Sequence, residues 1–420
     1  MNFEYSCIEC GNSYPIAIGR YLCDNCSSTQ GKDEPLRGLL EVRLSGDPPR
    51  DWMAVERGEK TPVSDIGACW NRSGRVLNPG RAESTPCPDI RALLPVRKDC
   101  LPPIPVGGTP LWTPTRLRRD LGLDGLFLKD EGANPTGSLK DRASYLVAGF
   151  AAEHELGDVI VASTGNAGSS MAGIGAAGNL HVRLYLPASA PEAKMVQALQ
   201  YGADLIRVDG GYDTAFDMSL AYVAERGGLS RNTAHNPLTV EGKKTVSLEI
   251  FLQLGRRTPD LIYVPTGDGV ILSGVYKGFE DLVTLGLTDA VPTLVCVQAK
   301  GSAAISRAHE DGEFGLIHPA ATIADSISVD VPRGGFFALD RLKRHGGRCV
   351  TVSDEAILAA QSRLSASSGF FAEPAAAAAF AGLLADIDSG SGPAAGDLVV
   401  LLLTGSGLKD IATALKGVQS

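Results

Sequence analysis

Short apolar runs recur along this chain of 420 residues, and each is separated from the next by a segment with helical character. Runs of this length that alternate with helices are typical of strands in a parallel sheet whose two faces are both covered. The runs form two series, one on either side of residue 240, so we predict an α/β fold with two three-layer lobes. They occupy residues 126–128, 158–162, 181–186, 204–208, 260–264, 293–297, 348–352 and 397–403.

The composition is that of an ordinary globular enzyme, with 44% apolar and 21% charged residues. The net charge of −9 argues against a nucleic-acid partner and against binding to an anionic membrane surface. No apolar run reaches the roughly 20 residues of a spanning helix, and the first residues show neither the basic nor the apolar region of a signal peptide. We therefore expect a cytoplasmic protein that acts on a small molecule, with a homodimer as the commonest assembly.

Four cysteines near the N-terminus stand in two close pairs, Cys7 with Cys10 and Cys23 with Cys26. This spacing is typical of two knuckles that give four thiolates to one structural zinc ion. Thirty residues bury too little apolar surface to fold alone, so the metal would supply the folding energy of a zinc-ribbon-like segment over residues 1–30. The alternatives are a disulfide pair and a site that has lost its metal.

The stretch from residue 31 to 105 is rich in proline and glycine and contains no long periodic segment. Proline lacks a backbone donor and breaks both helices and central strands. We therefore predict an irregular arm that wraps the body and forms no domain of its own.

A turn-forming stretch around Lys140 follows the run at 126–128 and precedes an apolar helical segment. Its asparagine, proline and glycine residues favour a turn, and Ser138 is a candidate N-cap, so Lys140 is expected in the first helical turn. The helix dipole disfavours a cation there, which suits an amine that acts as a nucleophile toward an aldehyde. The alternative is a solvated corner formed by Lys140, Asp141 and Arg142.

The stretch Asn134-Pro135-Thr136-Gly137-Ser138-Leu139-Lys140-Asp141-Arg142 resembles the Schiff-base lysine motif of the threonine synthase family, a branch of the fold type II pyridoxal-phosphate (PLP) enzymes. The similarity extends from residue 106 to the C-terminus, and the cysteine cluster also matches. It implies a tryptophan synthase β-like fold, PLP as cofactor, and Lys140 as the catalytic residue that binds it covalently. Together with the apolar runs, it divides the chain into a large PLP-binding lobe (106–150 and 240–420) and a small substrate lobe (151–239).

The loop Ser163-Thr164-Gly165-Asn166-Ala167 comes directly after the run at 158–162 and before a helix of small residues. Glycine lets backbone N–H groups approach a ligand, and a helix start favours an anion, which suits the α-carboxylate of an amino acid. The resemblance implies that Asn166 hydrogen-bonds the 3-hydroxyl of PLP while the loop binds the substrate carboxylate. An ordinary capping loop is the alternative.

A second loop, formed by Gly267, Asp268, Gly269, Val270 and Ile271, follows the run at 260–264. Its glycines can adopt positive φ, so that successive N–H groups converge on a phosphate at a helix start. The resemblance makes this loop the cradle of the PLP phosphate, and a plain turn is the alternative. We expect the Asp268 carboxylate to point away from the phosphate, because burying two anions together is costly.

Thr404 follows the last apolar run, at 397–403. The resemblance places its hydroxyl against the pyridine nitrogen of PLP. A hydroxyl holds a protonated ring less well than a carboxylate, which favours elimination of a β or γ substituent over racemisation or transamination. Glu373 also matches a family segment near the pocket, either as a proton-handling group or as an acid at a helix start.

The dinucleotide-binding pattern Gly-x-Gly-x-x-Gly occurs at Gly173, Gly175 and Gly178. It begins inside a helical segment and not at a strand-to-helix turn. We therefore interpret these glycines as sites of close packing between the helix and the sheet, and predict no dinucleotide site.

The sequence departs from the family where threonine synthases bind the phosphate of O-phosphohomoserine. Ala167 stands at a hydroxyl position and Thr239 at an arginine position, while Thr233 and Ala234 replace an Asn-Ser pair. A buried dianion without these donors is poorly compensated. The differences place the use of O-phosphohomoserine in doubt.

These observations predict a PLP-dependent lyase or synthase that eliminates or replaces a β or γ substituent of an amino acid, with threonine synthase as the nearest named activity. The alternatives are a serine or threonine ammonia-lyase, a β-replacing synthase of a specialised pathway and, outside catalysis, a PLP-binding or zinc-ribbon scaffold. Other contacts to a substrate anion could come from His235, Lys243 and Lys244. For the two lysines, the alternative is a solvated position.

Overall fold

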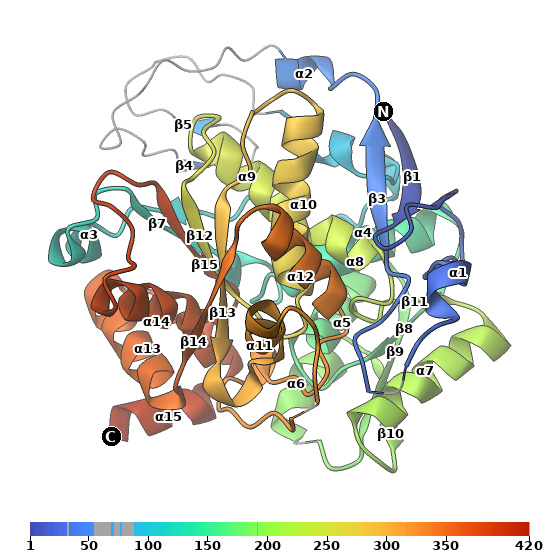
Figure 1. Cartoon of the computed structure of the whole chain (residues 1–420). Coiled ribbons are helices and arrows are strands. Elements are labelled where there is room, and N and C mark those ends of the chain that lie inside the picture. Colours follow the sequence, from blue (N-terminus) through green and yellow to red (C-terminus); the bar gives the residue numbers. More distant parts are fainter. Residues whose placement is uncertain are drawn as a thin grey trace.

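The computed structural model describes residues 1–31, 33–53, 69–70, 76–77, 88–190, 192–316 and 318–419. These residues form two α/β lobes and a small N-terminal sheet (Figure 1). Much of the predicted arm lies outside the described residues. Among the described helices, none has both the length and the apolar character needed to cross a bilayer.

The large lobe is built on a six-stranded sheet with strand order β14-β13-β12-β15-β7-β6. All neighbours are parallel except the edge strand β6, which runs antiparallel to β7. A parallel sheet with helical crossovers is what the alternating pattern predicts. The strands are β6 (Leu111–Trp112), β7 (Leu126–Asp130), β12 (Leu261–Pro265), β13 (Thr293–Ala299), β14 (Arg348–Val352) and β15 (Val399–Leu403).

Both faces of this sheet are buried. In β15, Leu401 contacts the core on the side of α14 (Pro374–Asp388), whereas Leu402 contacts the core on the side of α10 (Val270–Thr284). Successive side chains of a strand point to opposite faces, so a continuous apolar run fits a sheet between two helical layers. The other helices of this lobe are α3 (Thr115–Leu121), α8 (Leu238–Lys243), α9 (Thr245–Gln253), α11 (Ala304–Asp311), α12 (Gly335–Arg344), α13 (Asp354–Ser368) and α15 (Ile411–Gln419).

The small lobe is built on a four-stranded parallel sheet with strand order β10-β9-β8-β11. Its two faces are also covered, because Val161 packs on the side of α5 and Ile160 on the side of α7. The strands are β8 (Asp158–Ala162), β9 (His181–Pro187), β10 (Asp204–Val208) and β11 (Leu229–Ser230), and the helices are α4 (Lys140–Glu153), α5 (Asn166–Ala177), α6 (Glu192–Gln200) and α7 (Tyr212–Arg226).

The Gly-x-Gly-x-x-Gly pattern lies within α5 and its C-cap, as expected for packing glycines. A Cβ at Gly173 would come within 2.7 Å of Thr136 Cγ2, and one at Gly175 would collide with Val182 of β9. The glycines therefore bring α5 close to its neighbours.

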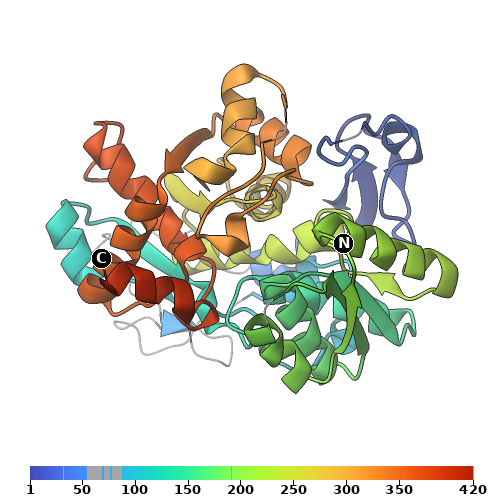
Figure 2. The same ribbon diagram turned by 90° about the horizontal axis from the view of Figure 1, so that it is seen from below.

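The N-terminal unit is a three-stranded antiparallel sheet of β1 (Asn2–Cys7), β2 (Ser13–Tyr14) and β3 (Leu40–Ser45), with α1 (Asp24–Ser27) beside it. Since β3 pairs with β1 along its whole length, the sheet extends past residue 30 into the stretch expected to be irregular. It lies beside the small lobe, away from α15 (Figure 2). Three further short elements are α2 (Arg50–Met53), β4 (Cys69–Trp70) and β5 (Val76–Leu77).

Candidate active site

Lys140 lies in the first turn of α4, as predicted, and is the first residue of that helix, after the turn that follows β7. The prediction of Ser138 as N-cap is wrong: Leu139 occupies that position, and the buried Ser138 hydroxyl finds no hydrogen-bond partner in the part of the chain that the structure describes. The turn is held instead by Asp141, whose carboxylate accepts from the N–H (2.8 Å) and the hydroxyl (2.5 Å) of Thr136. The Asp141 side chain, in the first turn of the helix, therefore makes the hydrogen bonds to the preceding turn that a capping residue was expected to make.

Arg142 is buried in an ion-pair network, so the alternative of a solvated corner is also wrong. Its Nε lies 2.6 Å from Glu131 Oε2 and its Nη2 lies 2.7 Å from Glu249 Oε2. Lys129 adds a third ion pair, with its Nζ 2.7 Å from the same Glu249 oxygen. Burial raises the pKa of Glu249, but Arg142 and Lys129 outweigh burial and hold that pKa far below its usual range. The network fixes the start of α4 to β7 and α9.

Three segments that are distant in sequence meet at this turn. Ser138 forms an isolated antiparallel bridge with Gly405, and Ala372 forms another with Ser406. The backbone N–H of Leu139 donates to the carbonyl of Thr404 over 2.9 Å. The structure therefore brings the loop after β15 directly against the lysine turn.

Asn166, at the start of α5, faces Glu373 across the two lobes. Its Nδ2 donates to both carboxylate oxygens of Glu373, at 3.1 and 2.9 Å, and to Ser326 Oγ at 3.2 Å. Glu373 precedes α14, but its side chain makes no capping bond. Burial raises the pKa of its carboxyl, and the Asn166 amide partly offsets that rise. The carboxyl therefore belongs to the site and does not act as a helix cap.

The loop after β12 and Lys140 line a cavity of about 60 Å³, together with residues 326, 327 and 329. Gly269 has φ of +86°, and a Cβ at Gly267 would come within 2.9 Å of the Ile327 backbone, so both positions require glycine. The Asp268 carboxylate turns back onto the helix start and accepts from the Val270 N–H at 3.1 Å. Ile271 also lines the cavity.

The loop after β8 has the geometry of an anion site. Gly165 is the N-cap of the twelve-residue helix α5, and no side chain caps that helix. Ser163 Oγ accepts from the Gly165 N–H over 3.2 Å, which shapes the loop. The free N–H groups of a helix start favour a carboxylate or phosphate. Thr164 and Ala167 complete this loop at the carboxyl end of the sheet.

Burial and nearby charged groups shift the pKa of the Lys140 amine. Burial lowers the pKa of its amine, Asp268 opposes this, and Arg231 adds to it. A neutral amine is a better nucleophile than an ammonium group. The environment therefore prepares Lys140 for attack on a carbonyl carbon.

The three residues predicted from the sequence as alternative contacts to a substrate anion lie in different environments. Lys244 is buried in ion pairs with Glu241 and Asp281, so it is structural. His235 is half-buried, against the rings of Tyr21 and Phe216. Lys243 is fully buried, and its Nζ has no hydrogen-bond partner among the described residues. Neither of the two lysines lies in solvent.

Three further residues of the site have little sequence signal. Ser326 lies in the short 3-10 helix Asp325–Ile327, and only the fold brings it to Asn166. Lys409 reaches from the loop after β15 to Ser169 Oγ of α5 at 2.9 Å. Arg231 directly follows β11. The feature of the sequence that could have predicted it as a site residue is a cation at the carboxyl end of a strand.

Comparison with known proteins identifies the family. A family model described as pyridoxal-phosphate dependent enzyme matches residues 104–405. Threonine synthase from Methanosarcina acetivorans is 32% identical over 98% of this chain and 94% of its own length. Threonine synthase from Mycobacterium tuberculosis is 36% identical over 81% of this chain and 94% of its own length. The chain belongs to the threonine synthase family of pyridoxal-phosphate dependent enzymes.

Solved structures confirm the predicted fold type II architecture. Threonine deaminase isoform 2 from Solanum lycopersicum has a TM-score of 0.65 with 22% identity, covering 74% of this chain and 87% of its own. Maize serine racemase has a TM-score of 0.63 with 22% identity, covering 74% of this chain and 91% of its own. The protein is therefore a PLP-dependent lyase or synthase that acts by elimination or replacement on a small amino-acid substrate, and the relatives do not favour the ammonia-lyase alternative.

The residues of the site fit PLP. Lys140 offers a buried amine with a lowered pKa, and the loop at 267–271 offers a helix start with backbone in the left-handed region. The two features lie on one cavity, so an aldehyde and a phosphate of the same molecule can reach them together. Asp268 must release the Val270 N–H if that donor is to serve the phosphate.

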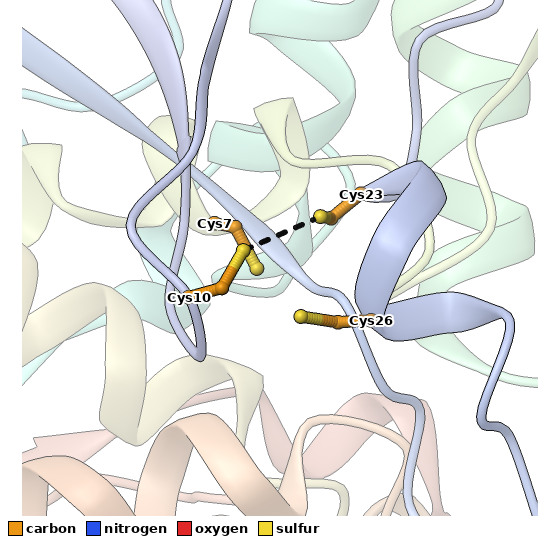
Figure 3. A group of neighbouring side chains, drawn as sticks. All are labelled: Cys7, Cys10, Cys23 and Cys26. Atoms are coloured by element: carbon orange, nitrogen blue, oxygen red, sulfur yellow. Dashed lines mark hydrogen bonds between the residues drawn. The ribbon is translucent and has the colours of Figure 1, made fainter.

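The four N-terminal cysteines converge, with their sulfur atoms all within 4.8 Å of one another (Figure 3). Cys7 and Cys10 come from the turn after β1, and Cys23 and Cys26 from the start of α1. The Cys10 and Cys23 sulfurs are 3.6 Å apart, close to the roughly 3.8 Å of two thiolates on a tetrahedral zinc ion. This donor set fits a structural zinc ion, and the four thiols form no disulfide in the structure.

Proposed function

We propose that Lys140, Asn166, Thr404 and the loop Gly267–Ile271 form the PLP site of this enzyme, and that the loop Ser163–Ala167 binds the α-carboxylate of its amino-acid substrate. The observation that carries the proposal is the meeting of these segments at the carboxyl ends of strands β7, β8, β12 and β15. Ligands of open α/β sheets bind at that edge.

Each residue has a defined part in this proposal. When bound, PLP supplies an aldehyde carbon for covalent attachment and a ring that accepts electrons. Lys140 Nζ holds the cofactor and, when released, moves the proton at the substrate α-carbon. Asn166 and Thr404 orient the ring through its 3-hydroxyl and its nitrogen. Glu373, buried with a raised pKa beside Asn166, is placed to hold a proton near the ring.

The substrate proposal follows from the missing donors. Thr239, at the position of the family arginine, is buried and donates its hydroxyl to the carbonyl of Asn236 at 2.7 Å, so it is not free for a ligand. Ala167 and Ala234 carry no polar side chain. We therefore propose a substrate other than O-phosphohomoserine, or O-phosphohomoserine bound by different groups.

A substrate panel tests the proposed reaction. PLP-loaded enzyme is incubated with serine, threonine, O-acetylserine, O-acetylhomoserine and O-phosphohomoserine, and released leaving group, keto acid and new amino acids are quantified. Turnover of at least one activated ester, at least about tenfold above the deamination of serine or threonine, is expected because acetate and phosphate are better leaving groups than the hydroxyl of serine or threonine. Deamination of serine or threonine as the main activity would contradict the proposal.

We also propose that Cys7, Cys10, Cys23 and Cys26 hold a structural zinc ion. Four thiolates leave no open position for a substrate. The sheet of β1 and β3 buries Tyr5, Leu40 and Val42 in the core of the small lobe, while the segment that carries the cysteines would be held together by the metal. The metal therefore contributes to the folding of residues 1–45 and not to catalysis.

Metal analysis tests the zinc proposal. The purified protein is expected to contain about one zinc per chain, and Cys23→Ser to retain less than about a tenth of it, since a tetrahedral structural site needs all four ligands. The variant is expected to gain protease sensitivity in residues 1–45 while the lobes stay folded. Cys100→Ser, at a partly exposed cysteine outside the cluster, is the control. Unchanged zinc content in Cys23→Ser would refute the site.

We propose a cytoplasmic homodimer as the assembly. Cytosolic reducing conditions suit the four unpaired thiols. Helix α15 exposes Ile411, Leu415 and Val418, which lie on one helix face because they are four and three residues apart. An exposed apolar face of this kind favours a protein contact, and a symmetric pair is the commonest solution.

A further inference from the structure

Two buried cations near the proposed PLP site lack an anionic partner. Arg231 and Lys243 are both 0% exposed. Arg231 Nε donates to Ser144 Oγ at 3.2 Å and its Nη1 to Thr233 Oγ1 at 2.7 Å, but its Nη2 has no partner. Lys243 Nζ has no partner at all, and within the described ranges neither cation forms an ion pair with a carboxylate.

Three other buried cations in the described part of the chain are paired with carboxylates, whereas Arg118, at 8% exposed, forms no ion pair and packs its guanidinium on the Phe127 ring. Lys244, Lys277 and Arg142 are equally deep, and each forms two or more ion pairs with buried carboxylates. An unpaired charge in the protein interior costs several kcal/mol. Arg231 also adds to the effect of burial in lowering the pKa of Lys243, so the two cations repel each other. Buried polar groups without a partner in the protein point to a partner that a ligand supplies.

Arg231 and Lys243 approach the site from different sides. The Arg231 N–H donates to the carbonyl of Ile160 at 2.8 Å, which places Arg231 at the carboxyl end of the small-lobe sheet, where the loop after β8 begins. Lys243 ends α8 and packs on α10, because a Cβ at Gly274 would come within 2.7 Å of Lys243 Cβ.

The pKa values of Arg231 and Lys243 both depend on charged residues of the site. Burial lowers the pKa of Arg231 to about 10, and Asp268 opposes that shift. Burial also lowers the pKa of Lys243 well below its usual range, with Lys140 adding to the shift and Asp268 opposing it. Both groups therefore interact with charged residues that line the cavity. A bound anion would compensate the cost of burying their positive charges.

We propose that Arg231 and Lys243 bind an oxyanion on the side chain of the amino-acid substrate, in place of the donors missing at positions 167, 234 and 239. This inference rests on the proposed function and narrows its substrate class to amino acids with an anionic side-chain group. The phosphate of PLP has its own cradle at the start of α10, whereas Arg231 comes from the lobe that binds the substrate carboxylate. Since both cations are closed off from solvent, the lobes must part to admit the substrate.

Matched substrates test this inference on the PLP-loaded enzyme. The values of kcat/KM are compared for O-phosphoserine with O-acetylserine and for O-phosphohomoserine with O-acetylhomoserine. The phosphorylated member of at least one pair is expected to be preferred at least about tenfold. Lys243→Met and Arg231→Met are expected to lower kcat/KM for that member by about 10- to 100-fold, mainly through KM, because each removes a charged hydrogen bond. The acetyl ester is expected to lose less kcat/KM than the phosphorylated member, because it has no anionic group for either cation to bind.

Two controls separate binding from folding. Lys243→Arg and Arg231→Lys keep the charge and are expected to retain more of the preference than the methionine variants. Lys243→Met without substrate is expected to melt no lower than the parent, because it removes an unpaired buried charge. Equal loss on both members of a pair, a preference for both acetyl esters, or a weakened affinity for PLP in the methionine variants would overturn the inference. Failure to turn over any member would instead refute the proposed function.

Discussion

Replacing Lys140 with alanine is expected to lower turnover by about 10³-fold or more while leaving the protein folded. The side chain is the nucleophile toward the cofactor and the base at the α-carbon, and each of these parts contributes orders of magnitude to a rate. The measurement is steady-state turnover of the best ester, together with mass spectrometry of borohydride-treated protein. The parent is expected to carry the reduced cofactor on residue 140, and the variant to carry none.

The control for this experiment is Lys140→Arg, which keeps a cation at the start of α4 but offers no amine that deprotonates near neutral pH. It is expected to be as inactive as the alanine variant, since charge alone does not replace a nucleophile. Retention of more than a tenth of the parent turnover by either variant would show that another group does the chemistry. Lys243 is then the other buried amine of the site to examine.

Replacing Arg142 with methionine is expected to lower the free energy of unfolding by about 3–5 kcal/mol, which is a large part of the stability of a typical protein. The change leaves Glu131 and Glu249 buried with Lys129 as their remaining cation. Two carboxylates that share one cation repel each other, and one of them must take up a proton or reach water. Urea unfolding of the protein without cofactor, followed by circular dichroism, measures the loss.

Arg119→Met is the matched control for this loss. Arg119 also contacts a carboxylate, with its Nη2 3.1 Å from Asp120 Oδ1, but its side chain is 76% exposed. An exposed ion pair contributes at most about 1 kcal/mol, so little change is expected. Equal losses from the two substitutions would mean that the buried ion pairs of Arg142 contribute no more to the free energy of unfolding than the exposed ion pair of Arg119.

The arginine of the lysine motif therefore serves the fold, and the lysine serves the chemistry. Lys140 and Arg142 are neighbours in sequence, yet one lines the cavity and the other lies in a closed network with Glu249 of α9. A helix places residues two apart on different faces, so one short motif can anchor itself and still present an amine. We expect loss of Arg142 to impair activity through a displaced α4.

The amino-acid sequence by itself determined the parts of this protein that depend on short-range pattern. Apolar runs predicted the strands, because a strand buried on both faces needs continuous apolar side chains. The turn formers before Lys140 predicted a helix with this residue in its first turn. The spacing of Cys7, Cys10, Cys23 and Cys26 predicted one cluster, because two knuckles can share a single metal.

Only the tertiary structure decided which polar side chains face the site and which are structural. Lys243 and Lys244 are adjacent and chemically alike, but Lys244 meets carboxylates from α8 and α10 while Lys243 meets none. The pairing of Asn166 with Glu373 and the place of Arg231 depend equally on contacts between distant segments. The physical reason is that the partners of a buried charge are chosen by how sheets and helices pack, and local sequence does not record that packing.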